Sequence, residues 1–200
     1  MYNLNDSLVN LGLKDVEINS ILIDMDGVLV DDVGMYQLLM KDHYMPSLVQ
    51  YLKITGQKQK LIAPLVFKAI EQNLFATAPP LSFTTIVRDS LIPFWKSKGI
   101  AVSILTSTME VNPLREELEE QKLSWLADNG FEGVPVIFAK GSKEKQNYAK
   151  EGVLLIDDYD RTVGQFRQKG GCSIQYTDLR SCLDQLNLLN LSTQLGLFSD

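Results

Sequence analysis

The sequence has little of several features that mark particular protein classes. Its 200 residues include two cysteines, Cys172 and Cys182, and one histidine. Two cysteines cannot build a disulfide framework, and no Cys/His cluster has the spacing of a zinc site. No apolar run reaches the roughly 18 residues that span a bilayer, and the polar, acidic start does not resemble a secretory signal. We therefore expect a cytoplasmic protein with no membrane partner.

Basic residues are also scarce, with 19 Lys and Arg against 25 Asp and Glu and a formal net charge of −6. Binding to a polynucleotide needs clustered basic side chains, whereas the densest basic stretches, 53–60 and 140–150, are short and interrupted by other residues. We therefore expect no nucleic-acid polymer as partner, although such a stretch could attract a small phosphorylated substrate. The chain is 45% hydrophobic and 22% charged, which is ordinary globular usage.

Short apolar runs predict a parallel sheet. Runs rich in Val, Ile and Leu are typical of strands that are buried on both faces. Four such runs and a weaker fifth are Ile21–Ile23, Val102–Leu105, Val134–Phe138, Val153–Ile156 and Cys172–Tyr176. Helical segments separate the later runs, so the sequence predicts an α/β fold, a Rossmann-like open parallel sheet flanked by helices.

Capping residues predict where those helices begin and end. Asn112-Pro113 would open one helix and Asn129-Gly130 would close it. Ser142 would cap a helix through Lys150 and Asp160 one that ends at Gly170. Asp178 would begin a terminal helix that ends near Leu189.

The stretch between the first two predicted strands is too long for a direct crossover. Asp32 to Phe75 is helical by its apolar spacing and is followed by the helix breaker Pro79-Pro80. We therefore predict a small helical cap, residues 32–81, inserted into a core of residues 1–31 and 82–200.

Two carboxylates follow the first strand. Asp24 and Asp26 are separated by one residue, and Gly27 then allows a sharp turn. At the carboxyl end of a parallel strand they would face the crevice where open α/β sheets bind ligands. Carboxylates this close repel each other, and a hard divalent cation is one way to stabilise both. An aspartate can also attack phosphorus, while a second one exchanges protons with the leaving oxygen and water.

Two further strand ends carry polar residues. Val102–Leu105 is followed by Thr106 and Ser107, and Val153–Ile156 by the paired acids Asp157 and Asp158. Each feature taken alone has a plain structural explanation, as turn chemistry or helix capping. Together and in this order they resemble the motifs of the haloacid-dehalogenase superfamily.

That resemblance implies a magnesium-dependent phosphatase. In it, Asp24 is the nucleophile and Asp26 the acid/base, and Thr106 with Ser107 binds the phosphoryl group. Asp24, the main-chain carbonyl of Asp26 and one of the following pair of acids, in preference Asp158 over Asp157, would hold Mg²⁺.

The superfamily also needs a lysine that neutralises the transferred phosphoryl group. Lys143, at the start of the helix before the fourth strand, is our preferred candidate, and Lys122 is its rival. Lys140 and Lys145 are solvated alternatives nearby.

A narrower resemblance is to the 5′(3′)-deoxyribonucleotidase branch. It rests on the Thr-Ser pair, on a Lys-x-x-Trp from Lys122 to Trp125 and on the Leu-Ile-Asp-Asp that ends at Asp158. The departures are Thr108, where the branch has Pro, and a longer spacing from Lys143 to the paired acids. A nucleoside monophosphate is therefore the expected substrate. A sugar phosphate, phosphoglycolate, a polynucleotide 3′-phosphate or a catalytically silent binding protein remain alternatives, and a homodimer is left open.

Overall fold

The computed structural model describes residues 16–42, 59–108 and 113–192. Its centre is a five-stranded, all-parallel sheet in the order β3-β2-β1-β4-β5. The strands are β1 (Ser20–Ile23), β2 (Ala101–Ser107), β3 (Val136–Ala139), β4 (Val153–Asp157) and β5 (Cys172–Gln175). All five predicted strands and the α/β fold class are confirmed, with boundaries shifted by one or two residues. The order places β1 between β2 and β4, so the residues after these three strands meet at one edge.

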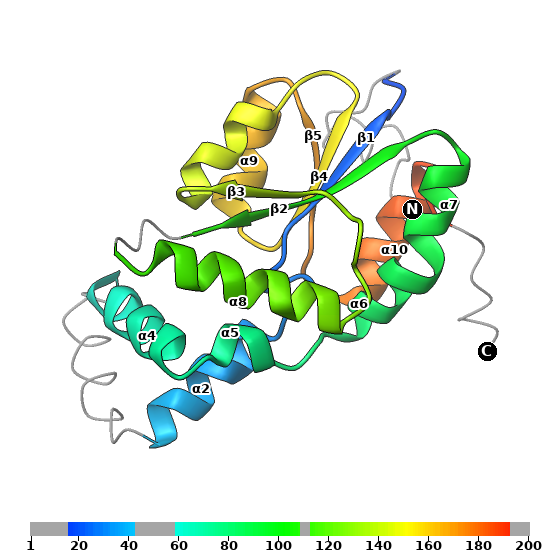
Figure 1. Ribbon diagram of the computed structural model, residues 1–200. Coiled ribbons are helices and arrows are strands. Elements are labelled where there is room, and N and C mark those ends of the chain that lie inside the picture. The colour runs from blue at the N-terminus through cyan, green and yellow to red at the C-terminus, as the bar shows by residue number, and fades with distance from the viewer. Residues whose placement is uncertain (1–15, 43–58, 109–112, 193–200) are drawn as a thin grey trace.

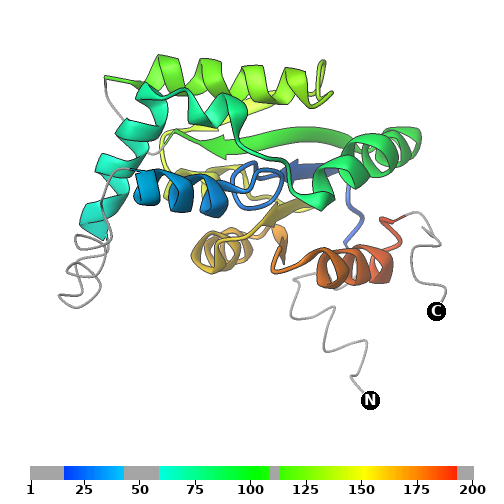
Figure 2. The same ribbon diagram turned by 90° about the horizontal axis from the view of Figure 1, so that it is seen from below.

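Helices cover both faces of this sheet (Figures 1 and 2). Ile21 and Ile23 of β1 point into the larger core, and Leu22 between them points into a smaller one, as the period of two along a strand requires. The larger core takes side chains from α6 (Ser82–Ile86), α7 (Ile92–Ser97), α8 (Arg115–Asp128) and α10 (Leu179–Leu188). The smaller core is closed by α9 (Asp160–Gln168), which lies across the sheet from α7 and α10 in Figure 1.

The described part of the predicted cap is mostly helical. It contains α2 (Asp32–Asp42), α4 (Gln59–Glu71) and α5 (Leu74–Thr77), and residues 43–58 lie outside the described residues. The chain leaves and re-enters the core at one place, where Asp31 N donates to Pro79 O at 2.9 Å and Leu81 N to Leu29 O at 2.8 Å. The division into a core and a cap stays a prediction.

The helix ends match the capping signals in part. Asp178 accepts a hydrogen bond from Ser181 N and begins α10, as predicted. The segment after Ser142 differs, because Ser142–Tyr148 (η2) is a 3₁₀ helix whose first residue makes no side-chain cap. Residues i and i+3 of a 3₁₀ helix share one side, so Ser142 and Lys145 both line the same cavity. Asp160 is the first residue of α9 and not its cap, since Tyr159 holds that position.

Among the described helices, none is both long enough and apolar enough to cross a bilayer.

Candidate active site

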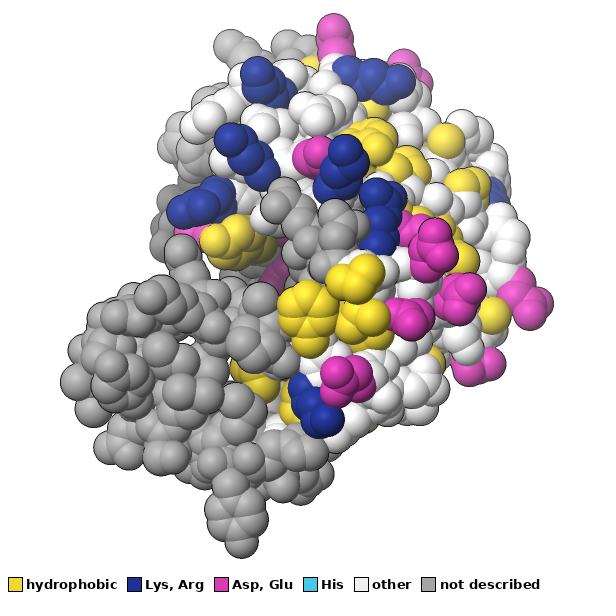
Figure 3. All heavy atoms as spheres, turned by 60° about the vertical axis from the view of Figure 1, so that its left-hand side comes forward, with side chains coloured by type: hydrophobic (Ala, Val, Ile, Leu, Met, Phe, Trp, Pro, Cys, Tyr) yellow, Lys and Arg dark blue, Asp and Glu magenta, His cyan; other side chains and the backbone are white. Residues whose placement is uncertain are grey.

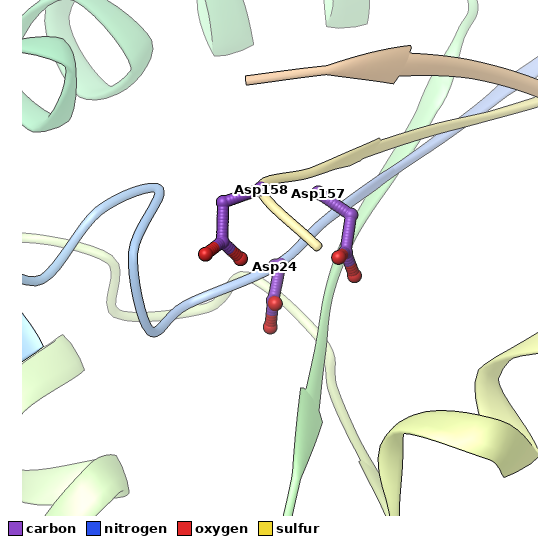
Figure 4. A group of neighbouring side chains, drawn as sticks. All are labelled: Asp24, Asp157 and Asp158. Carbon is purple, nitrogen blue, oxygen red and sulfur yellow. The ribbon is translucent and has the colours of Figure 1, made fainter. Parts of the chain in front are cut away.

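Three carboxylates gather where β1 and β4 end. Asp24 follows β1, Asp157 is the last residue of β4, and Asp158 comes next. One oxygen of each lies within 4.8 Å of the others, and Figure 4 shows all three carboxylates directed to the same side. Asp24 and Asp157 are buried, whereas Asp158 is exposed. The structure therefore brings together carboxylates that are separated by more than a hundred residues in sequence.

Gly27 makes room for one of these carboxylates. Its φ is +73°, and a Cβ built on it would lie 2.5 Å from Asp158 Oδ2. A side chain here would meet both the strain of the left-handed region and a steric clash. Glycine is therefore required for Asp158 to reach its place.

Lys145 is the basic partner of the acidic cluster. Its Nζ lies 2.6 Å from Asp24 Oδ2 and 2.7 Å from Asp157 Oδ2, and only 2% of the residue is exposed. The interpretation of Lys145 as a solvated alternative is therefore wrong. Lys143, the preferred candidate, lines the same cavity but is exposed. The lysine that pairs with Asp24 is Lys145.

A signal for Lys145 was present in the sequence. The spacing from Lys143 to the paired acids is longer than the resemblance requires, and Lys145 is two residues closer to them. What the sequence could not show was the 3₁₀ geometry of η2, which turns this lysine inward.

Hydrogen bonds distinguish Asp157 from Asp158. Asp157 Oδ2 accepts from Lys145, and its Oδ1 accepts from Tyr159 N at 3.0 Å. Both oxygens of Asp157 therefore have partners within the protein, whereas the exposed Asp158 is the acid better placed to offer an oxygen to an added cation.

Crowding of carboxylates changes their protonation. Burial raises the pKa of Asp24 well above its usual value, with Asp157 and Asp26 adding to the rise and Lys145 opposing it. Burial and the neighbouring Asp157 raise the pKa of Asp158 to about 6. Asp32, at the start of α2, faces the same group, and burial with Asp26 and Asp158 raises its pKa to about 7.

The pKa of Lys145 is raised in spite of its burial. Burial alone would lower its pKa, but Asp24 and Asp157 outweigh that effect and raise it. Lys145 therefore stays an ammonium ion beside Asp24.

These features fit a divalent cation. Hard cations bind carboxylate oxygens, and a positive charge would offset the burial and the repulsion that raise the pKa values of Asp24 and Asp158. The missing Cβ of Gly27 leaves space for the Asp158 carboxylate. Among the described residues this is a group of acids that could hold a metal ion.

Asp26 is not part of this group and pairs with a different lysine. Its Oδ2 accepts a hydrogen bond from Lys122 Nζ, and its Oδ1 is buried without a partner among the described atoms. Lys122 also donates to Thr106 Oγ1 at 2.7 Å. The two aspartates that follow β1 therefore have different lysines and different surroundings.

A cavity of about 380 Å³ opens over the site. Its wall includes Asp24, Asp26, Asp32, Ser107, Ser142, Lys143, Lys145, Asp158, Tyr159 and Thr162. Of the predicted phosphate-binding pair, Ser107 lies on this wall, and Thr106 is fully buried beside Lys122.

Basic side chains stand near the cavity although the chain is acidic. Lys and Arg gather on one half of the face shown in Figure 3. Lys140 and Lys143 flank Ser142, Arg161 precedes Thr162, and all three basic residues are exposed. Positive charge beside the acidic wall can help to attract an anionic ligand.

Solved structures with a similar fold are known. L-2-haloacid dehalogenase from Xanthobacter autotrophicus is 14% identical with a TM-score of 0.52, over 81% of this chain and 78% of that one. A haloacid dehalogenase-like family hydrolase from Xanthomonas campestris is 12% identical with a TM-score of 0.52, over 92% and 95% of the two chains.

The chain has the haloacid-dehalogenase fold. A second structure of the Xanthobacter autotrophicus dehalogenase, with chloropropionic acid covalently bound, is 12% identical with a TM-score of 0.50 and covers 88% of this chain and 85% of that one. A scan with protein-family models gave no match, and a search of curated proteins found no similar sequence. The fold agrees with the superfamily resemblance, and the site is the basis for a more specific proposal.

Proposed function

We propose that this chain is a magnesium-dependent hydrolase of phosphate monoesters that works through an aspartyl-phosphate. The observation that carries the proposal is the division between the two aspartates after β1. Asp24 faces Lys145 and the acidic cluster, whereas Asp26 is held by Lys122 with one oxygen unpartnered. This difference supports a nucleophilic role for Asp24 and a proton-transfer role for Asp26.

The second aspartate favours an ester over a halide as substrate. A halide leaves as a stable anion, whereas an alkoxide leaving group needs a proton as its bond breaks. Asp26 lies on the cavity wall and could supply that proton. A dehalogenase, which the structural neighbours suggest as the second candidate, would have no use for an acid at this position.

Magnesium would be held by Asp24, Asp158 and, as the resemblance implies, the main-chain carbonyl of Asp26, and it would supply positive charge against the phosphate oxygens. Asp24 attacks phosphorus in line, with Lys145 and Ser107 on the wall to bind phosphoryl oxygens. Asp26 protonates the leaving oxygen and then takes a proton from the water that hydrolyses the aspartyl-phosphate.

The substrate class we propose is a nucleoside monophosphate. The exposed Tyr159 lies on the cavity wall and offers a face on which a base could stack. The basic side chains nearby suit a small anion. Tyr44 and Tyr51 of the predicted cap lie outside the described residues, while Phe75 packs edge-on against Tyr36 as part of the core.

The test is phosphate release from 5′- and 3′-nucleoside monophosphates and sugar phosphates, with Mg²⁺ and with EDTA, beside chloride release from 2-chloropropionate. We expect phosphate release from nucleotides only with Mg²⁺, and its loss in Asp24→Asn. Asp184→Asn, an exposed aspartate on α10, is the matched control and should keep full activity. Chloride release without phosphate release would replace the proposal with dehalogenation. No turnover of any ester by folded protein would favour the silent binding protein.

A further inference from the structure

Lys122 is a fully buried charge in the middle of α8, with no exposed surface. An ammonium group without partners is very costly to bury, so its contacts have to compensate the lost hydration. Unlike Lys143 and Lys145, it is absent from the wall of the cavity. Its role is therefore to be sought in the groups that it touches.

The three hydrogens of the ammonium have three acceptors. Lys122 Nζ donates to Asp26 Oδ2, to Thr106 Oγ1 at 2.7 Å and to the main-chain oxygen of Ser107 at 3.1 Å. Its fourth neighbour is the ring of Phe75, with the centroid 5.6 Å away. No donor is left for a phosphate, so these contacts do not suit the substrate-binding role for which Lys122 was considered.

These contacts fix the orientation of Asp26. With Oδ2 held by Lys122, rotation of the carboxylate is blocked, and Oδ1 is the oxygen that lacks a partner. Asp26 lines the cavity, and its buried Oδ1 is the oxygen that Lys122 leaves free to hold a proton.

Lys122 also fixes the orientation of the Thr106 hydroxyl. The hydroxyl oxygen accepts from the ammonium, so the hydroxyl hydrogen has to point elsewhere. One lysine thus joins the loop after β1 to the end of β2 and orients a polar group on each.

We propose that Lys122 is a positioning residue that presents Asp26 Oδ1 to the leaving group. The step rests on the proposed function: the bond from Asp24 to phosphorus forms as the bond from phosphorus to the ester oxygen breaks, and the proton moves from Asp26 to that oxygen. The carboxylate left on Asp26 remains paired with Lys122.

The leaving group distinguishes this role from a purely structural one. p-Nitrophenolate leaves readily without a proton, whereas an alkoxide does not. Lys122→Met should therefore lower kcat/KM, which reports the step in which the leaving group departs, by about 10²-fold or more on an alkyl phosphate, the range for loss of a general acid. On p-nitrophenyl phosphate kcat/KM should fall by less than about tenfold. KM should change little, because Lys122 does not face the cavity.

Lys98→Met is the matched control, because Lys98 also lies 5.6 Å from a ring centroid, that of Phe94, but is exposed. It should change neither rate. Should Lys122→Met fail to fold, Lys122→Gln, which keeps two amide donors, should show the same preference for the good leaving group. An equal loss on both esters in the folded variant would overturn the proposal.

A second readout separates this inference from the proposed function. Beryllium fluoride with Mg²⁺ should form an adduct on Asp24 in the wild type and in Lys122→Met alike, because Asp24 is held by Lys145. Absence of the adduct and of all ester turnover in the wild type would count against the proposed function. An adduct that forms in the wild type but not in Lys122→Met would instead show that Lys122 acts on Asp24, and so contradict a role confined to Asp26.

Discussion

Gly27 is a single residue at which two constraints coincide. Its backbone is left-handed, and its missing Cβ is what allows Asp158 to approach. Gly99 has nearly the same φ, +74°, but no atom within 4 Å of a built Cβ. Comparing an alanine at each position therefore distinguishes the destabilisation caused by backbone strain from that caused by the steric clash.

We expect Gly99→Ala to lower the free energy of unfolding by about 1–2 kcal/mol, through strain alone. Gly27→Ala should lower it further and should also weaken Mg²⁺ binding, because Asp158 is displaced. Urea denaturation in EDTA measures the first effect, and calorimetric titration with Mg²⁺ the second. Equal Mg²⁺ affinity in Gly27→Ala and wild type would contradict the assignment of Asp158 as a ligand.

Helix α8 is the element that connects the predicted cap to the core. Trp125 Nε1 donates to Ala78 O at 2.7 Å, and Gln121 Nε2 donates to Ile70 O at 2.8 Å. Lys122, on the same helix, lies against Phe75 of α5. The helix that orients Asp26 therefore also fixes the segment through which the chain returns to the sheet.

We expect Trp125→Phe to lower the free energy of unfolding by about 1–3 kcal/mol, since it leaves the carbonyl of Ala78 without its donor. Trp95→Phe is a matched change, because Trp95 is equally buried and donates to Leu191 O at 2.6 Å. Both variants should be destabilised in thermal melts, but only Trp125→Phe should raise KM. A raised KM in both would show a general effect of lost stability.

For the molecule as a whole, the carboxylates of the site make the free energy of unfolding depend on pH. Asp24, Asp158 and Asp32 have folded-state pKa values above the ordinary 3.8. Between about pH 4 and pH 7 the unfolded chain has lost these protons while the folded one retains them. Without metal, their contribution to stability therefore falls as the pH rises through this range.

We expect Asp32→Asn to be more stable than the wild type in EDTA above about pH 7, the pKa of Asp32, and to approach it near pH 4. Mg²⁺ should raise the melting temperature of the wild type more at high pH than at low pH, because the cation binds ionised carboxylates. Melting curves across this range check both expectations. Asp184→Asn, the exposed control, should show no such pH-dependent gain.

The local pattern determined the sheet and the polar ends of its strands. A strand that is buried on both faces is a run of Val, Ile and Leu. Asp24 and Thr106 follow such runs directly, and Asp158 follows one after Asp157. Since the carboxyl ends of adjacent parallel strands meet at one edge, these residues could be grouped without coordinates. That part of the site was within reach of the sequence.

Tertiary structure alone decided the roles of the lysines. Lys122, Lys143 and Lys145 look alike in sequence, because a lysine on a helix or turn is usually solvated. Only packing shows that Lys145 enters the acidic cluster through a 3₁₀ turn and that Lys122 is enclosed beside Asp26. A buried charge depends on partners far away in the chain, and short-range patterns carry no record of them.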